Sequence, residues 1–148
     1  MEKDVIISIK GVQRYENADP DTMELVTAGR LEREGNSYTL SYQESELTGL
    51  EGTLTTFQIE PERITLMRVG EFNSQMVFQE GRRHMSMYNT PYGAMTIGVN
   101  TRHLLAELDD QGGEIEIDYA IEIDHSVAGR NTFQINVKEA EVAVSLQA

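Results

Sequence analysis

The chain has 148 residues, 39% of them hydrophobic and 25% charged, so it is long enough for one domain with a substantial core and is unlike a disordered chain in composition. Its 25 acidic residues against 12 basic ones give a formal charge of -13, which repels nucleic-acid backbones and anionic membranes and makes both poor candidate partners. The absence of cysteine excludes disulfides, thiolate nucleophiles and cysteine-based zinc sites, and it fits a cytoplasmic protein.

The first third of the chain alternates apolar and polar residues in short segments, the pattern of half-buried strands. The first strand opens at 5–9, an apolar run too short for a signal peptide or a membrane span. Turns rich in Gly, Asn, Asp or Pro at 16–22 and 34–36 separate it from strands over 23–31 and 38–42. The second and third strands are therefore expected to form a hairpin.

The middle of the chain continues the alternation with short links. Four strands are predicted over 53–60, 63–70, 75–81 and 82–90. The segment 94–110 begins as a strand, but its three leucines near the end would also suit a helical turn. We interpret it as a strand that is extended or bulged.

The last third contains the clearest strand, over 115–123, where isoleucines and a tyrosine alternate with acidic residues. Its acidic side chains, Glu122 among them, are expected to form a solvated outer face. In the final strand the apolar parity changes between 133–137 and 142–146. A bulge or bend near Glu139 would reconcile the two halves.

About ten strands with short links predict a single all-β domain over 1–148, an antiparallel meander barrel of about 8–10 strands. Closure would remove exposed sheet edges, and a barrel of this size is either filled or holds one small ligand. Because the final strands are irregular, the sequence is compatible with a partly open barrel as well as with a closed one. A two-sheet sandwich is the structural alternative.

Three segments in order along the chain resemble the YwiB-like family of bacterial calycin-type β-barrels: YQESELTGLEGTLTTFQI (42–59), LMRVGE (66–71) and YNTPYGAMTIGVNT (88–101). The corner YNTPYG is the most distinctive piece, and the resemblance extends over nearly the whole chain. It implies a lipocalin-like barrel in the cytoplasm. Because that family is a domain of unknown function, the resemblance supplies no catalytic residue.

Two charged residues continue the apolar faces of predicted strands. Glu44 has the parity of Tyr42, and Arg68 has that of Leu66, so both are expected to point into the barrel near one mouth, where a charge must be paired or used. One hypothesis is that Arg68 anchors the acidic group of a ligand. The alternative is that the two side chains pair with each other, or that Arg68 reaches solvent.

The other candidates for a pocket wall are His84 and three tyrosines, since aromatic bodies with a polar tip are common there: Tyr42, Tyr88 and Tyr92. A core role is the alternative for each, and the ring of Tyr92 at its turn would pack back on the barrel. Four methionines in adjacent strands suit an adaptable pocket or, as we favour, an irregular core: Met76, Met85, Met87 and Met95.

No cofactor is expected, because His84, His103 and His125 have no chelating spacing and the chain lacks a nucleophile elbow, a phosphate loop and a Walker lysine. Our first hypothesis is a non-catalytic barrel that binds a small amphipathic or anionic molecule. The second is a structural or interaction barrel with a filled core, in a homodimer. The third is an enzyme that uses Glu44 and Arg68. A measured cavity would favour the first over the second.

Overall fold

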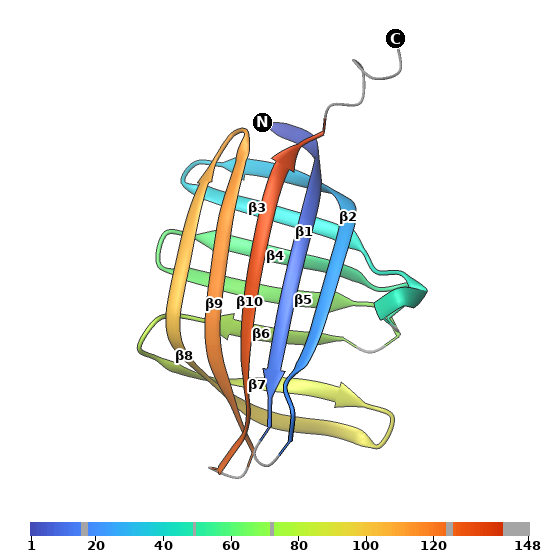
Figure 1. The fold of residues 1–148 in the computed structure, drawn as a ribbon, viewed down its shortest axis with the longest axis vertical. Coiled ribbons are helices and arrows are strands. Elements are labelled where there is room, and N and C mark those ends of the chain that lie inside the picture. Colours follow the sequence, from blue (N-terminus) through green and yellow to red (C-terminus); the bar gives the residue numbers. More distant parts are fainter. Residues whose placement is uncertain (16–17, 49, 72, 124–125, 141–148) are drawn as a thin grey trace.

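A computed structural model describes residues 1–15, 18–48, 50–71, 73–123 and 126–140, apart from the side chains of 47 and 87–90. Ten strands and one 3-10 turn make up this described chain (Figure 1). They are β1 (Glu2–Arg14), β2 (Asp21–Glu34), β3 (Ser37–Gln43), η1 (Glu46–Thr48), β4 (Leu54–Glu60), β5 (Arg63–Val69), β6 (Ser74–Phe78), β7 (Arg83–Thr90), β8 (Gly93–Asp109), β9 (Gly112–Ile123) and β10 (Ser126–Glu139). No helix in the described ranges is long and apolar enough to cross a membrane.

The strands form a meander that closes on itself. Each strand pairs antiparallel with the next along the chain, and β10 pairs with β1, so the ring of neighbours returns to its start. The predicted all-β barrel of about ten strands is therefore confirmed. In Figure 1 the long strands β1, β2, β8, β9 and β10 run together across the front, and β3 to β6 cross behind them.

Closure is incomplete along β2. This strand pairs with β3 only over Arg30–Glu34, whereas Asp21–Gly29 pairs with β1 and, among the described residues, with no strand on its other edge. We call this free edge of Asp21–Gly29 the open seam. It begins at Gly29, where an added Cβ would lie 2.5 Å from the backbone oxygen of Ser41. The missing side chain lets β2 and β3 approach closely at the corner before they diverge.

One end of the barrel, the end where β10 finishes and β2 turns into β3, is packed solid. Inward side chains from both sets of strands meet there and are fully buried, including Val5, Ile7, Leu31, Leu40 and Ile115. Inward and outward residues alternate along β1 and β9, as their sequence pattern predicts. Burial of these apolar side chains stabilises the fold.

Two irregularities were expected in the last strands. The register of β8 against β9 shifts between Thr101 and His103, which confirms the bulged strand over the ambiguous segment. Strand β10 has its own shift between Val127 and Gly129 and ends at Glu139. The parity change at 142–146 lies outside the described residues.

The outer face of β9 differs from its prediction at one position. Glu122 is 8% exposed rather than solvated, and Nε of Arg83 lies 2.7 Å from its Oε1. Gly98 on β8 is its register partner and has no side chain to hold it away from the sheet. The carboxylate therefore packs against the sheet over the glycine, and the arginine covers it.

Candidate ligand cavity

The opposite end of the barrel, near the connection from β1 to β2, is hollow. A cavity of about 420 Å3 opens partly to solvent there, within the usual size range of small-molecule sites. Its apolar lining comes from seven strands and includes Val12, Met23, Leu66, Met76, Ile97, Tyr119 and Phe133. The barrel thus has a packed half and a hollow half.

The cavity exists partly because Gly11 occupies an inward position of β1. Earlier inward positions on this strand carry valine or isoleucine, such as Ile9. A Cβ at Gly11 would lie 3.4 Å from the Phe133 ring and 3.7 Å from Cε of Met23. The glycine therefore leaves room for the phenyl ring, and a side chain longer than alanine would enter the cavity.

Two aromatic rings, Tyr119 and Phe133, line the inner wall of the cavity, and the buried Phe78 packs against the first of them. The ring centroids of Phe78 and Tyr119 are 4.7 Å apart, and those of Tyr119 and Phe133 are 5.9 Å apart. Nδ2 of Asn131 donates a hydrogen bond of 3.2 Å to the Tyr119 hydroxyl. Both of these polar residues are buried, so the wall is fixed in position by contacts on several sides.

Two methionines stand at the mouth. Met23 and Met95 both line the cavity, yet they are 42% and 39% exposed. Flexible thioether chains at an opening can adapt to ligands of different shape. The exposed polar residues Gln13 and Thr22 complete this part of the rim.

The carboxylate of Glu44 is held beside the cavity by two hydroxyl groups. Its side chain is 2% exposed. Thr48 donates to Oε1 at 3.0 Å, and Thr55 donates to Oε2 at 2.6 Å. Each oxygen of this buried carboxylate therefore has its own neutral donor, supplied by the loop after β3 and by β4.

Arg68 reaches into the cavity from β5, as its parity predicts, and it lies among the lining residues. Its Nε is 3.9 Å from Oε2 of Glu44, close enough for electrostatic attraction but too far for a hydrogen bond. This Nε is buried and has no hydrogen-bond partner among the described residues. The ion pair between the two side chains forms, but it leaves the Nε donor of the guanidinium unused.

Tyr42 lies next to this pair as part of the core rather than of the cavity lining, and it is 6% exposed. The pKa of its phenol is raised, chiefly by burial and then by the negative charge of Glu44, which outweighs the opposing charge of Arg68. The hydroxyl therefore stays protonated throughout the neutral range.

The structure separates His84 and Tyr92 from the cavity, and it does not describe the side chain of the third remaining candidate. His84 is half-buried, its Nε2 lies 3.1 Å from Oε1 of Gln79, and it is not a lining residue. The side chain of Tyr88 lies outside the described part of the chain. Tyr92 is 99% exposed, so its ring neither lines a pocket nor packs back on the barrel. Thr90 pairs with Gly93, and Tyr92 is therefore a central residue of a hairpin turn that points away from the wall.

The methionines divide in a similar way. Met76 and Met95 line the cavity, whereas Met85 is 62% exposed on the outer face. The side chain of Met87 lies outside the described residues.

Sequence reasoning missed the residues that build most of the cavity. Tyr119 and Phe133 belong to ordinary apolar stripes, and nothing in local alternation distinguishes a ring that faces a cavity from one that faces the core. Two signals were available: a glycine at the inward position Gly11, and the polar residue Asn131 on the inward parity of Phe133.

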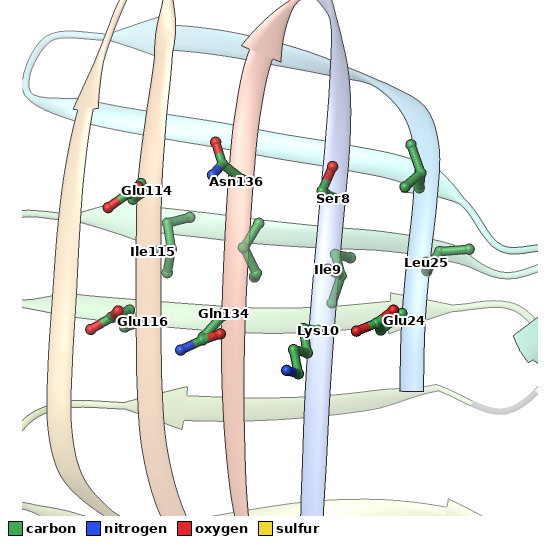
Figure 2. A pocket seen from close by; sticks show the side chains of 12 residues that line it. Ser8, Ile9, Lys10, Glu24, Leu25, Glu114, Ile115, Glu116, Gln134 and Asn136 are labelled. Carbon is green, nitrogen blue, oxygen red and sulfur yellow. The ribbon is translucent and has the colours of Figure 1, made fainter. Parts of the chain in front are cut away.

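A second concavity, of about 470 Å3, lies on the outer face of the sheet across β2, β1, β10 and β9 (Figure 2). The polar side chains that line it are exposed or half-buried, and none of them is an enclosed donor that lacks a partner. They are Ser8, Lys10, Glu24, Glu114, Glu116, Gln134 and Asn136. In the described ranges no cluster of His, Asp and Glu could hold a metal ion. The interior cavity is therefore the better candidate site.

A family model described as "Domain of unknown function (DUF1934)" matches residues 7–135. The chain belongs to the DUF1934 family. Its fold is similar to that in the "Crystal structure of ywiB protein from Bacillus subtilis", with a TM-score of 0.82 and 20% sequence identity over 94% of this chain and 93% of that one. The resemblance to the YwiB-like family is thus confirmed, and at this identity the likeness shows the fold alone. No curated protein matches this DUF1934 chain.

Proposed function

We propose that the barrel binds a small amphipathic molecule, with the ligand's acidic group at Arg68 and its apolar body against the aromatic wall. The observation that carries the proposal is the buried Nε of Arg68, a residue at the wall of a cavity of about 420 Å3, which lacks a hydrogen-bond partner within the part of the chain that the structure describes. An unused buried donor costs free energy, and an acceptor on a ligand would recover it.

The charges at the site favour a hydrogen-bonded acid over a densely charged anion. Glu44 and Arg68 lie 3.9 Å apart and nearly cancel each other's charge, so an incoming carboxylate gains mainly from hydrogen bonds to the guanidinium. The aromatic and methionine lining would hold the apolar part of the same molecule. This combination supports an amphipathic ligand such as a medium-chain carboxylic acid.

The same geometry supports binding rather than catalysis. Both oxygens of Glu44 accept hydrogen bonds from threonines, which leaves this carboxylate poorly placed to transfer protons. A guanidinium has N–H donors and no acceptor, so Arg68 is suited to hold an acceptor rather than to act as a base. We also propose that the protein acts in the cytosol, because a chain without cysteine has no disulfides that would need an oxidising compartment.

Calorimetric titration with octanoate and with octanol tests this function. We expect octanoate to bind the natural chain and to lose roughly tenfold or more in affinity in the Arg68→Met variant, as for a lost hydrogen bond to a charged group. Octanol, which lacks the carboxylate, should bind both proteins alike. Arg63→Met is the matched control, because Arg63 starts the same strand but is exposed and pairs with Glu60.

Two results would overturn the proposal. One is the absence of heat of binding for both probes with the natural chain. The other is equal affinity of the natural chain and the Arg68→Met variant for octanoate.

A further inference from the structure

The open seam of β2 is an unpaired sheet edge that solvent reaches. The inward residues of β1, such as Ile7, are buried, whereas on β2 the inward Met23 is 42% exposed and Leu25 and Thr27 are half-buried. Along the nine residues Asp21–Gly29, every second residue therefore presents its backbone donor and acceptor on an edge with no strand beside it in the described chain.

Apart from the charges of Asp21 and Glu24, this edge lacks the features with which proteins usually prevent strand pairing. Asp21–Gly29 contains no proline and no lysine, and its register against β1 runs without a bulge. Val26, near its centre, is 70% exposed on the outer face, and Ile6, which lies diagonal to it on β1, is 39% exposed. An exposed edge with an apolar centre is the kind of surface that another strand covers.

We infer that the open seam pairs antiparallel with the open seam of a second copy of this chain, about a two-fold axis at Val26. In that arrangement residues 23–29 of the two copies lie entirely within the free edges, and Arg30, which is already paired with β3, is left undisturbed. A two-fold pairing of one edge with itself is a common closed form of dimer.

The charges along the edge fit a second copy despite the net charge of -13. With the axis at Val26, Glu24 of each copy faces Ala28 of the other, so the two glutamates are not opposed. Glu24 also lies diagonal to Arg30 of the second copy, within reach for long side chains. Arg30 already pairs with Glu2, so this cation sits between two carboxylates.

The dimer would join two curved sheets into one. The outer faces of β1 and β2, where Glu24 and Lys10 are seen in Figure 2, would continue across the axis into the same faces of the second copy. Val26 would meet its own symmetry mate, a β-branched pair of the type that stabilises antiparallel ladders.

Cysteine crosslinking tests the axis directly, because the chain has no cysteine of its own. Under mild oxidation Val26→Cys should give a disulfide-linked species of twice the 16.7 kDa chain mass. Val127→Cys is the control: Val127 is 51% exposed on β10, away from the seam, and this variant should stay uncrosslinked.

Sedimentation velocity over a concentration series provides the second readout. We expect a dimer for the natural chain and for Val127→Lys, and a monomer for Val26→Lys, in which two like charges would face each other at the axis. Thermal melts followed by circular dichroism establish whether each variant is folded. If Val26→Lys is unfolded, the crosslinking of Val26→Cys alone tests the inference.

Three outcomes would overturn the inference: a natural chain that is monomeric up to its solubility limit, a dimer that persists in Val26→Lys without crosslinking of Val26→Cys, and a monomer whose seam takes up an extended peptide instead of a second copy.

Discussion

The hydroxyl of Thr55 donates to Oε2 of Glu44 at 2.6 Å, while Nε of Arg68 stays 3.9 Å from that same oxygen. The same carboxylate oxygen thus has a short hydrogen bond to the threonine and only a longer electrostatic contact with the arginine. We expect this neutral donor on β4 to hold the guanidinium back from Glu44 and so to keep it available to the cavity. The availability of Arg68 depends on a residue that does not line the cavity itself.

Replacing Thr55 with valine should change both stability and binding. The Thr55→Val variant leaves a buried carboxylate oxygen without its short hydrogen bond, at an expected cost of about 1–3 kcal/mol in the free energy of unfolding. Arg68 can then approach Glu44, so affinity for octanoate should fall while affinity for octanol stays the same. Urea denaturation and calorimetry measure the two effects.

The neighbouring Thr56→Val is the matched control, because Thr56 alternates with Thr55 on β4 and is half-buried. It should leave octanoate affinity unchanged. A Thr55→Val protein with natural affinity for octanoate would show that the threonine does not hold the arginine in its open position.

Tyr42 should make the fold sensitive to alkali. Because the pKa of its phenol is raised in the folded state, the unfolded chain loses this proton first, near pH 10, and the folded chain keeps it. Stability is therefore unaffected by Tyr42 below pH 10 and falls above it, by up to about 1.4 kcal/mol per pH unit from this one group.

Urea denaturation between pH 8 and the alkaline limit of the fold, run on Tyr42→Phe, would measure this contribution. The variant should lose stability less steeply above about pH 10. Tyr92→Phe removes a hydroxyl from a ring that is 99% exposed and should keep the steep loss. Parallel curves for the natural chain and Tyr42→Phe would contradict the prediction.

Filling the cavity should abolish binding of both probes. In Gly11→Val the new side chain starts 3.4 Å from the Phe133 ring and extends into the cavity, so octanoate and octanol should both lose affinity. This pattern differs from that of Arg68→Met, which is expected to affect the acid alone. Calorimetry on both variants separates the volume of the site from its polar anchor, and unchanged octanol binding by Gly11→Val would place the probe elsewhere.

Gly29 should tolerate substitution poorly. A Cβ there would lie 2.4 Å from Cδ1 of Ile7 and 2.5 Å from the Ser41 backbone oxygen, so Gly29→Ala must shift backbone at the corner and should cost about 1–3 kcal/mol, as overpacking does. Gly11→Ala, whose Cβ makes an ordinary 3.4 Å contact, is the control and should unfold at nearly the natural urea concentration. Equal midpoints for the two variants would show that the corner is not tightly packed.

Much of the fold could be predicted because alternation is local. The strand over 115–123 and the inward parity of Glu44 and Arg68 follow from a period of two, and short links then imply antiparallel neighbours. The bulge near Thr101 could be anticipated from the change of pattern there. These features depend on residues close together in the chain.

The hollow end could not be predicted in the same way, because it depends on register between distant strands. Gly11, Phe133 and Arg68 come from β1, β10 and β5 and meet only when the barrel closes. Glu122 shows the same limit. The alternation along its own strand predicts a solvated carboxylate, but a glycine on β8 and an arginine on β7 bury it.

Strands β1 and β10 each run through the packed half and the hollow half of the barrel, so one strand experiences two environments. We expect amide hydrogen exchange to be slow near Ile7 and Val137, whose side chains are buried at 0% and 2% exposure, and faster towards Gln13 and Asn131. The packed half then determines the free energy of unfolding. Substitutions in the hollow half can therefore alter ligand preference with little loss of stability. Sequence differences between members of the family should accordingly concentrate at the hollow end of strands that run through both halves.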